Sequence, residues 1–287
     1  MSSLTGPAEF GAETARTAAA GNRFAAVGDV LALTGRHLRH LRRTPEKLIA
    51  VALTPVAMVV ILGYLFASVI TIKGSGGVEY HDYVMAGVFA QIGLTCIGIT
   101  ALGVASDMGK GLIDRFRSLP MARSSVLVSH TAADLVPVAI SMVAVGGIGL
   151  LVGWRTDAGP LPILGGFALL LAFAYAMLWL GALLGMVLRN MEAINGISAL
   201  ALVILSFMSN SFMPLSGLPG WLRTAVEWNP VSTVSEACRV LWGNAPASSG
   251  GSLPMEHPVL VSAITVGALI AVLIPVALRT FRTAAVR

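Results

Sequence analysis

A histidine and an aspartate four residues apart, His130 and Asp134, are the residues whose types and spacing could move a proton. Residues at i and i+4 lie on one face of a helix, so the imidazole and the carboxylate could meet there. Asp134 is the one acid within a long apolar run, and an acid in such a place is a functional candidate. Its depth of about two to three helical turns also suits a structural pair at a helix end, which is the interpretation we favour.

Five uncharged polar residues lie in other apolar runs and could form hydrogen bonds there. Gln91 and Thr95 share one helix face, and Ser206, Ser209 and Asn210 share another. Such groups commonly join neighbouring membrane helices by hydrogen bonds, which is again the interpretation we favour. The alternative is that both faces line a largely apolar route for a transported molecule.

The sequence shows no motif for an active site of its own. A G-x-x-x-x-G-K-[ST] phosphate loop is missing, because "MGKG" has Val104 in place of the first glycine and Gly111 in place of Ser or Thr. Neither G-x-S-x-G nor H-E-x-x-H occurs. Cys96 and Cys238 form neither a disulfide framework nor a metal-ligand spacing. We therefore expect a chain that is not an enzyme and has no metal, bound cofactor or nucleic-acid partner.

The elements that carry these residues are predicted to be membrane helices. Hydrophobic residues make up 56% of the 287-residue chain, charged residues only 11%, and the mean hydropathy is +0.82. These values lie far from those of soluble domains. A crossing needs about 20 apolar residues for roughly 30 Å of hydrocarbon. Six runs qualify, at residues 48–72, 83–105, 124–154, 161–188, 193–212 and 258–279.

The positive charges predict the orientation of these six spans. Of the 19 Lys and Arg residues, 15 fall before the first span, after the sixth, or in the connections that share that side. Only Lys73, Arg155, Arg223 and Arg239 fall on the other side. Basic residues accumulate on the cytoplasmic side of membrane proteins. We therefore expect a multi-pass protein of the cytoplasmic membrane with both termini in the cytoplasm.

The region before the first span divides in two. Residues 1–24 are rich in Ala, Gly and Thr and are predicted to be a flexible cytoplasmic tail. Residues 25–47 combine helically spaced apolar residues with a cluster of arginines, which favours an amphipathic helix in the membrane interface over a simple positive anchor. The six-span domain then occupies residues 48–287.

A charged stretch between the second and third spans has the pattern of a short amphipathic helix. Its apolar residues, at spacings that gather on one side, are Met108, Leu112, Ile113, Phe116 and Leu119, and Pro120 ends it. Charged residues cover the rest. Such a helix could lie on the lipid surface, or it could dock into a groove of a soluble partner. Periodicity leaves both alternatives open.

Three stretches, in order along the chain, resemble type-2 ABC exporter permeases, in particular the daunorubicin-resistance permease group. The first is "GLIDRFRSLPMARSSVLVSHTAADL", which resembles the cytoplasmic loop of that group. The second is "RNMEAINGI", which resembles the start of its fifth span. The third is "FMSNSFMPLSGLPGWLRTAVEWNPVSTVSEACRVL", which resembles its outer segment. Together with the six-span layout, the resemblance covers nearly the whole chain.

The resemblance implies a permease that exports a hydrophobic drug, antibiotic or lipid-like substrate. In that family two permeases form the pathway, and two separate ATPase subunits, which use ATP and Mg²⁺, supply the power. The loop helix, here 107–119, would be the coupling helix that contacts the ATPase. The residues that this assigns to ATPase contact are Asp107, Lys110, Leu112, Ile113, Asp114, Arg115, Phe116, Arg117 and Leu119.

The same resemblance implies that spans two and five meet at the dimer interface and line the substrate route. It also favours short re-entrant helices between spans five and six, where residues 221–226 and 231–242 suit two helices, over helices that rest on the outer leaflet. The competing function is an ion-gradient-driven secondary carrier with Asp134 and His130 as proton relay. Such a carrier would be expected to show internal repeats and several charges at the membrane midplane, and the sequence shows neither.

Overall fold

The computed structural model describes residues 45–66, 78–109, 123–188, 190–213, 215, 218–245 and 252–284, and every regular element in these ranges is a helix. The all-helical fold class is therefore confirmed for this part of the chain. The predicted tail 1–24 and residues 25–44 of the predicted interfacial helix lie outside the described residues. In chain order the elements are α2 (Pro45–Val60), η1 (Ile61–Phe66), α3 (Tyr80–Gly109), α5 (Arg123–Val152), α6 (Pro160–Leu188), α7 (Met191–Phe207), α8 (Gly220–Glu227), α9 (Pro230–Trp242), α10 (Leu253–Glu256) and α11 (Pro258–Ala284).

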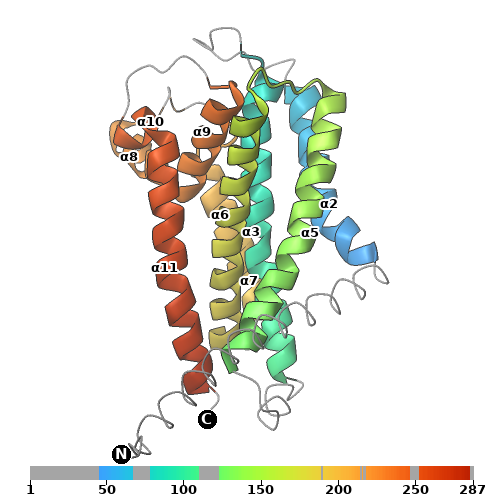
Figure 1. Cartoon of the computed structure of the whole chain (residues 1–287), viewed down its shortest axis with the longest axis vertical. Coiled ribbons are helices and arrows are strands. Elements are labelled where there is room, and N and C mark those ends of the chain that lie inside the picture. The colour runs from blue at the N-terminus through green and yellow to red at the C-terminus, as the bar shows by residue number, and fades with distance from the viewer. Residues whose placement is uncertain are drawn as a thin grey trace, which may run out of the picture.

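The apolar helices follow the predicted spans in order. Four are long and apolar enough to cross a membrane: Tyr80–Gly109, Thr131–Val152, Pro160–Leu188 and Pro258–Phe281. Two shorter apolar helices, Leu53–Gly63 and Met191–Phe207, correspond to the first and fifth predicted spans. The chain is thus an integral, multi-pass membrane protein. In Figure 1, α5 ends and α6 begins at the same end of the bundle as α8, α9 and α10, whereas α11 ends at the opposite end.

The fifth span is shorter than the sequence predicted. We expected a helix over 193–212, but α7 ends at Phe207 and the chain continues through bends. Ser and Asn side chains offer the backbone local alternatives to helical hydrogen bonds. Here Ser209 Oγ donates to the carbonyl of Ser206 at 2.5 Å and accepts from the amide of Ser211 at 3.2 Å. Residues 208–213 are called the α7 tail below.

Helix α3 forms the centre of the bundle. It packs against α2, α5, α6, α7 and α9, and 72% of its most apolar stretch is buried within this one chain. Figure 1 shows α3 between α6 and α5. By contrast, only 11% of the corresponding stretch of α11 is buried. Apolar side chains that remain exposed on such a helix, for example Leu260 and Ile264, face the hydrocarbon in a membrane.

Two glycines allow α3 and α6 to approach closely. A Cβ atom at Gly181 of α6 would collide with the carbonyl oxygen of Ile97, and one at Gly185 with that of Ala101. Small residues four apart are a common way for membrane helices to bring their backbones together. The contact fixes α6 against the central helix.

An aromatic cluster joins α9 to the bundle. The rings of Phe89 on α3, Trp154 after α5, Phe167 on α6 and Trp242 on α9 have centroids 5.3 to 5.8 Å apart. Tilted and edge-to-face contacts of this kind add to the free energy gained by burial. The cluster places α9 against α3 and α6 and so positions the polar groups described next.

Candidate functional site

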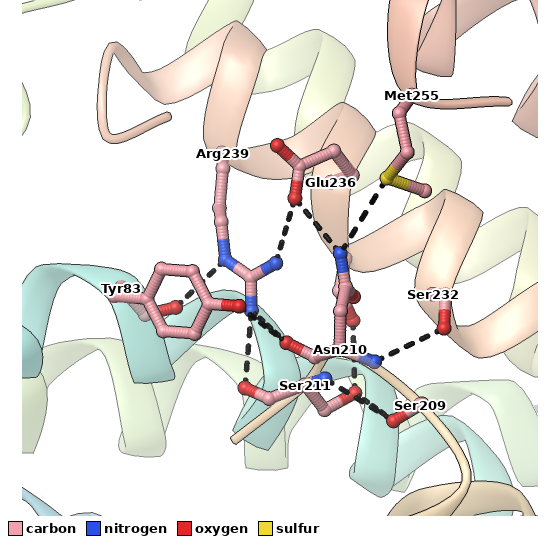
Figure 2. Close-up of polar contacts among 9 residues, drawn as sticks. Tyr83, Ser209, Asn210, Ser211, Ser232, Glu236, Arg239 and Met255 are labelled. Carbon is pink, nitrogen blue, oxygen red and sulfur yellow. Dashed lines mark hydrogen bonds and ion pairs between the residues drawn. The ribbon is translucent and has the colours of Figure 1, made fainter. Parts of the chain in front are cut away.

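The candidate site is the junction where the α7 tail meets α3 and α9. The tail is not helical, so its carbonyls lack partners of their own, and hydrocarbon offers none. Its sequence supplies short polar side chains, and its neighbours supply donors. Figure 2 shows these side chains converging on the tail from several elements.

Asn229 joins the first turn of α9 to the end of α7. Its carboxamide nitrogen donates to the carbonyl of Leu205 at 3.0 Å and to that of Met208 at 2.7 Å. Its carboxamide oxygen accepts from the amide of Val231 at 2.9 Å, which caps the N-terminus of α9. Pro230 at the first helical position suits the same helix start. The Asn229 side chain therefore caps the N-terminus of α9 and also satisfies carbonyls at the C-terminal end of α7.

Arg239 joins the other end of α9 to the tail and to α3. Its Nη2 donates to the carbonyls of Asn210 at 2.8 Å and Ser211 at 3.0 Å. Its Nε donates to the carbonyl of Tyr83 at 2.9 Å, and Nη1 forms an ion pair with Glu236 at 2.9 Å. Arg239 is fully buried, with an exposed fraction of 0%. A buried charge requires such complete pairing.

Two tyrosines of α3 complete the set of donors to the tail. The hydroxyl of Tyr83 donates to the carbonyl of Asn210 at 2.8 Å, and that of Tyr80 donates to the carbonyl of Phe212 at 3.2 Å. One turn further along α3, a Cβ at Gly87 would collide with the backbone of Ser211. The absence of a side chain at Gly87 is therefore what lets the tail lie directly on α3.

Serines from both sides fill the remaining space. The amide of Asn210 donates to Ser232 Oγ at 3.1 Å. The hydroxyl oxygens of Ser211 and Ser235 lie 3.2 Å apart, and those of Ser209 and Ser211 lie 2.8 Å apart. The tail and α9 thus face each other through buried hydroxyl groups. This arrangement can hold a non-helical backbone in an apolar environment; it contains no nucleophile paired with a base.

Of the five polar residues predicted to form interhelical hydrogen bonds or, alternatively, to line a pathway, Ser206, Ser209 and Asn210 lie at this junction. Gln91, Ser206, Ser209 and Asn210 are all buried within one chain, and Thr95 is partly buried and donates to Ile92 of its own helix at 2.7 Å. The expectation that Ser206, Ser209 and Asn210 share a helix face was wrong, because only Ser206 belongs to α7.

Three of these five residues carry buried polar atoms without a hydrogen-bond partner in the described part of the chain. The atoms are Gln91 Oε1, Ser206 Oγ and Asn210 Oδ1. The amide nitrogen of Asn210 is engaged, since it donates to Glu236 Oε2 at 2.9 Å. Unpartnered buried acceptors are costly and call for an explanation.

Asp134 pairs across two helices. Its Oδ2 accepts from Thr100 Oγ1 of α3 at 2.8 Å. This bond joins α5 to α3. The side chain of His130 lies outside the described residues, so the predicted pair of His130 and Asp134 stays a prediction.

Most of the predicted coupling helix lies outside the described residues. Asp107 is described and lies in the last turn of α3. The remaining contact residues fall in the part of the chain that the structure leaves undescribed: Lys110, Leu112, Ile113, Asp114, Arg115, Phe116, Arg117 and Leu119.

The two predicted outer helices exist as α8 and α9, and they differ in burial. Nine of the thirteen residues of α9 are buried. On and beside α8, Trp221 and Trp228 are 75% and 55% exposed. A buried acid, Glu227, accepts from Arg223 Nε at 2.7 Å and from Ser252 Oγ at 2.6 Å, which joins α8 to the segment before α10.

The residues that organise the junction were not predicted from the sequence. Arg239 was counted only as an outer basic residue, and Asn229, Glu236, Tyr80 and Tyr83 were not singled out. One signal was available: Glu236 and Arg239 are three apart, on one face of a segment rich in apolar and aromatic residues. A pair of charges in such a segment indicates a buried network. Among the described residues, no group of three or more His, Cys, Asp or Glu could hold a metal ion.

Comparison with known proteins adds a family. The family model described as ABC-2 type transporter matches residues 28–241. The chain is 30% identical over 260 residues to the daunorubicin resistance ABC transporter permease protein DrrB1 of Streptomyces coeruleorubidus, covering 91% of this chain and 88% of that protein. It is 24% identical over 220 residues to the probable doxorubicin resistance ABC transporter permease protein DrrC of Mycobacterium tuberculosis, covering 74% and 76%.

Proposed function

This chain belongs to the ABC-2 type transporter family as a permease subunit without an ATPase domain, and we propose that it exports a hydrophobic drug, antibiotic or lipid-like molecule outward. The observation that carries the proposal is the similarity to a daunorubicin resistance permease along 91% of the chain. Because the chain belongs to this family, we no longer retain the hypothesis of an ion-gradient-driven carrier.

Reconstitution tests this function. The permease is co-expressed with its partner ATPase, and the purified complex is placed in liposomes with daunorubicin as the probe. We expect daunorubicin to stimulate ATP hydrolysis and to move across the bilayer only when ATP is present. The control is the same complex with the P-loop lysine of the ATPase replaced, which removes the contact to the nucleotide phosphates. The proposal would be contradicted if daunorubicin did not change the rate of ATP hydrolysis and its movement across the bilayer did not depend on ATP.

We further propose that the ATPase contacts the connection between α3 and α5. In Figure 1 the end of α3 and the start of α5 lie at the end of the bundle opposite α8, α9 and α10. Phe116 is the largest apolar side chain on the predicted face, and Arg115 and Arg117 flank it. ATP and Mg²⁺ are bound by the partner, and two copies of each subunit make up the exporter.

The proposed topology has six crossings and cytoplasmic termini. The two shorter apolar helices, Leu53–Gly63 and Met191–Phe207, complete the six together with the four long ones. Support for the orientation is the accumulation of 15 of 19 basic residues on one side.

We propose that the route passes along α7 and the outer end of α3, at the interface with a second copy. Two observations support it. Gln91, Ser206 and Asn210 hold three buried polar atoms without partners among the described residues, which a polar group of a substrate that enters the bundle would satisfy. An exposed apolar stripe on α7, including Leu200, Val203 and Phe207, offers a surface to that copy.

The outer helices have two proposed roles. We assign α9 as the re-entrant helix, since most of it is buried among α3, α6 and α11. For α8 we propose a position in the outer membrane interface, because its exposed residues Trp221 and Trp228 favour that region.

A further inference from the structure

The contacts of Arg239 have a mechanical consequence for export. We propose that Arg239 is a positioning residue that holds the α7 tail, α9 and the first turns of α3 together as one rigid unit. This unit stays intact while the outer end of the proposed route opens during export. The inference rests on the proposed export function. It assigns the opening motion to the boundary between two copies and to α8 and α10, rather than to a separation of α9 from its own bundle.

A separation of α9 from the tail and α3 would break several hydrogen bonds of one buried charge at once. Arg239, which is fully buried, donates to the carbonyls of Tyr83, Asn210 and Ser211. Its ion pair with Glu236 lies within α9 and would move with that helix. A separation would therefore leave the guanidinium with fewer acceptors in an apolar environment, and the hydrogen bonds of a buried charged group are costly to lose.

Helix α9 is attached to α7 and its tail at both of its ends. Asn229, at its N-terminus, donates to the carbonyls of Leu205 and Met208. Arg239, in its last turn, binds the tail carbonyls two to three residues further on. Two attachments at the two ends of one helix prevent both its translation and its rotation relative to the tail.

Helices α8 and α10 differ from α9 because they pack on few other elements of the bundle. In the described residues α8 packs on α9 alone, and α10 packs on α9 and α11, among element pairs with substantial contact. Their link runs through Glu227, which binds Arg223 and Ser252. The side chains of Arg223 and Glu227 are 38% and 4% exposed, so breaking this link would leave a buried carboxylate without its partner, and α8 and α10 are expected to move together. Because they pack on few other elements, these two helices can move as a pair while α9 stays in place.

A reversible disulfide tests the proposal directly. The hydroxyl oxygens of Ser211 in the tail and Ser235 in α9 lie 3.2 Å apart, and both residues are buried. The double variant S211C/S235C therefore places two thiols within reach of a disulfide. The background carries C96A and C238A to remove the two native thiols. The single variants S211C and S235C, treated in the same way, are the matched controls.

The measurements are daunorubicin-stimulated ATP hydrolysis and daunorubicin export by the complete complex in liposomes, after oxidation and again after reduction. We expect the disulfide to form and both activities to be equal in the oxidised and reduced states. Loss of export on oxidation, regained on reduction, would overturn the proposal. Failure of the disulfide to form would contradict the contact on which it rests. If neither state exports, the failure belongs to the proposed function.

A second variant separates positioning from folding. Arg239→Gln in the S211C/S235C background removes the guanidinium but leaves the site for the disulfide. We expect reduced R239Q protein to lose export and oxidation to restore part of it, because the covalent bond then holds the tail on α9. A residue needed only for folding would give the same loss in both redox states, and that result would refute the positioning role.

Discussion

The guanidinium carbon of Arg239 lies 3.7 Å from the centroid of the Tyr83 ring, while Arg239 Nε donates to the carbonyl of the same tyrosine. The cation therefore meets α3 through both an aromatic face and a main-chain acceptor. Cation–π contacts gain strength where water is excluded, as at this buried site. The pair connects a residue in the last turn of α9 to the first turn of the central helix.

Stability should depend strongly on this arginine. Replacing Arg239 by Gln removes the ion-pair partner of Glu236 and the guanidinium bonds to the tail carbonyls. Asn210 keeps its bonds to Tyr83 and Glu236. Removal of one member of a buried pair costs about 3–5 kcal/mol. Thermal unfolding of the purified permease in detergent measures the effect. The control is Arg155→Gln, an exposed arginine that donates to the carbonyls of Leu150 and Trp154, for which we expect about 1 kcal/mol. Equal shifts in the two variants would contradict the network.

The contact between α3 and α6 should be intolerant of one added carbon. Gly181→Ala and Gly185→Ala each place a Cβ on a backbone carbonyl of α3, and overpacking of this kind costs about 1–3 kcal/mol. Gly267→Ala on α11 is the matched control, since nothing lies within 4 Å of its Cβ. We expect the melting temperature to fall for the first two variants only. A comparable fall for Gly267→Ala would indicate that helix composition, not the close approach, sets the cost.

The loop between α3 and α5 should retain the ATPase through Phe116. Truncation of an interface anchor can cost about 2 kcal/mol or more, and rim charges contribute much less. Phe116→Ala should leave the permease inserted in the membrane but reduce the ATPase that copurifies with it, and abolish export. Arg115→Glu should also weaken retention, and Lys110→Glu should matter less. Unchanged copurification with Phe116→Ala would instead support a loop that rests on lipid.

Cysteine labelling tests the orientation. We expect an impermeant thiol reagent to label Ser249→Cys from outside intact cells, because the segment between α9 and α10 is predicted to face outward. Ser118→Cys, in the connection between α3 and α5, should be labelled only after the cells are opened. The reverse pattern would invert the assigned topology while leaving the helices unchanged.

The proposed route predicts two different cysteine responses. Gln91→Cys and Ser206→Cys, at residues buried within one chain, should be protected from reagent by daunorubicin. Leu200→Cys and Phe207→Cys, on the exposed stripe of α7, should crosslink between two copies. The control is Leu260→Cys on α11, which is 60% exposed and should do neither. Indiscriminate reactivity at all five positions would remove the route assignment.

The sequence by itself determined the helices and several of their ends. Long apolar runs have to become helices in a membrane, because only internal hydrogen bonding satisfies the backbone there. Local residue types then decide the boundaries. Gly153, with φ of +116°, ends α5, and Asn190 caps α7 by accepting from the amides of Glu192 and Ala193. These signals act over a few residues, so a single sequence contains them in full.

Part of the candidate site was also within reach of the sequence. Ser206 and Asn210 were predicted to form interhelical hydrogen bonds or, as the alternative, to line a pathway. Both are buried where α7 ends, and the pathway role stays a prediction. Their geometry was not predictable, since periodicity assumes that a helix continues. The helix can end at Phe207 because other donors bind the carbonyls that follow it. Those donors come from α9 and α3.

Only the tertiary structure decided where Arg239 lies. From the sequence it was counted only among the basic residues of the outer side, and an unpaired arginine is too costly to bury. The fold brings the carbonyl of Tyr83, 156 residues earlier in the chain, and the tail carbonyls of Asn210 and Ser211 to the same guanidinium. Burial becomes possible once these acceptors and Glu236 surround it. The local spacing of Glu236 and Arg239 indicates one of these partners, but the carbonyls reach the guanidinium only after the chain has folded.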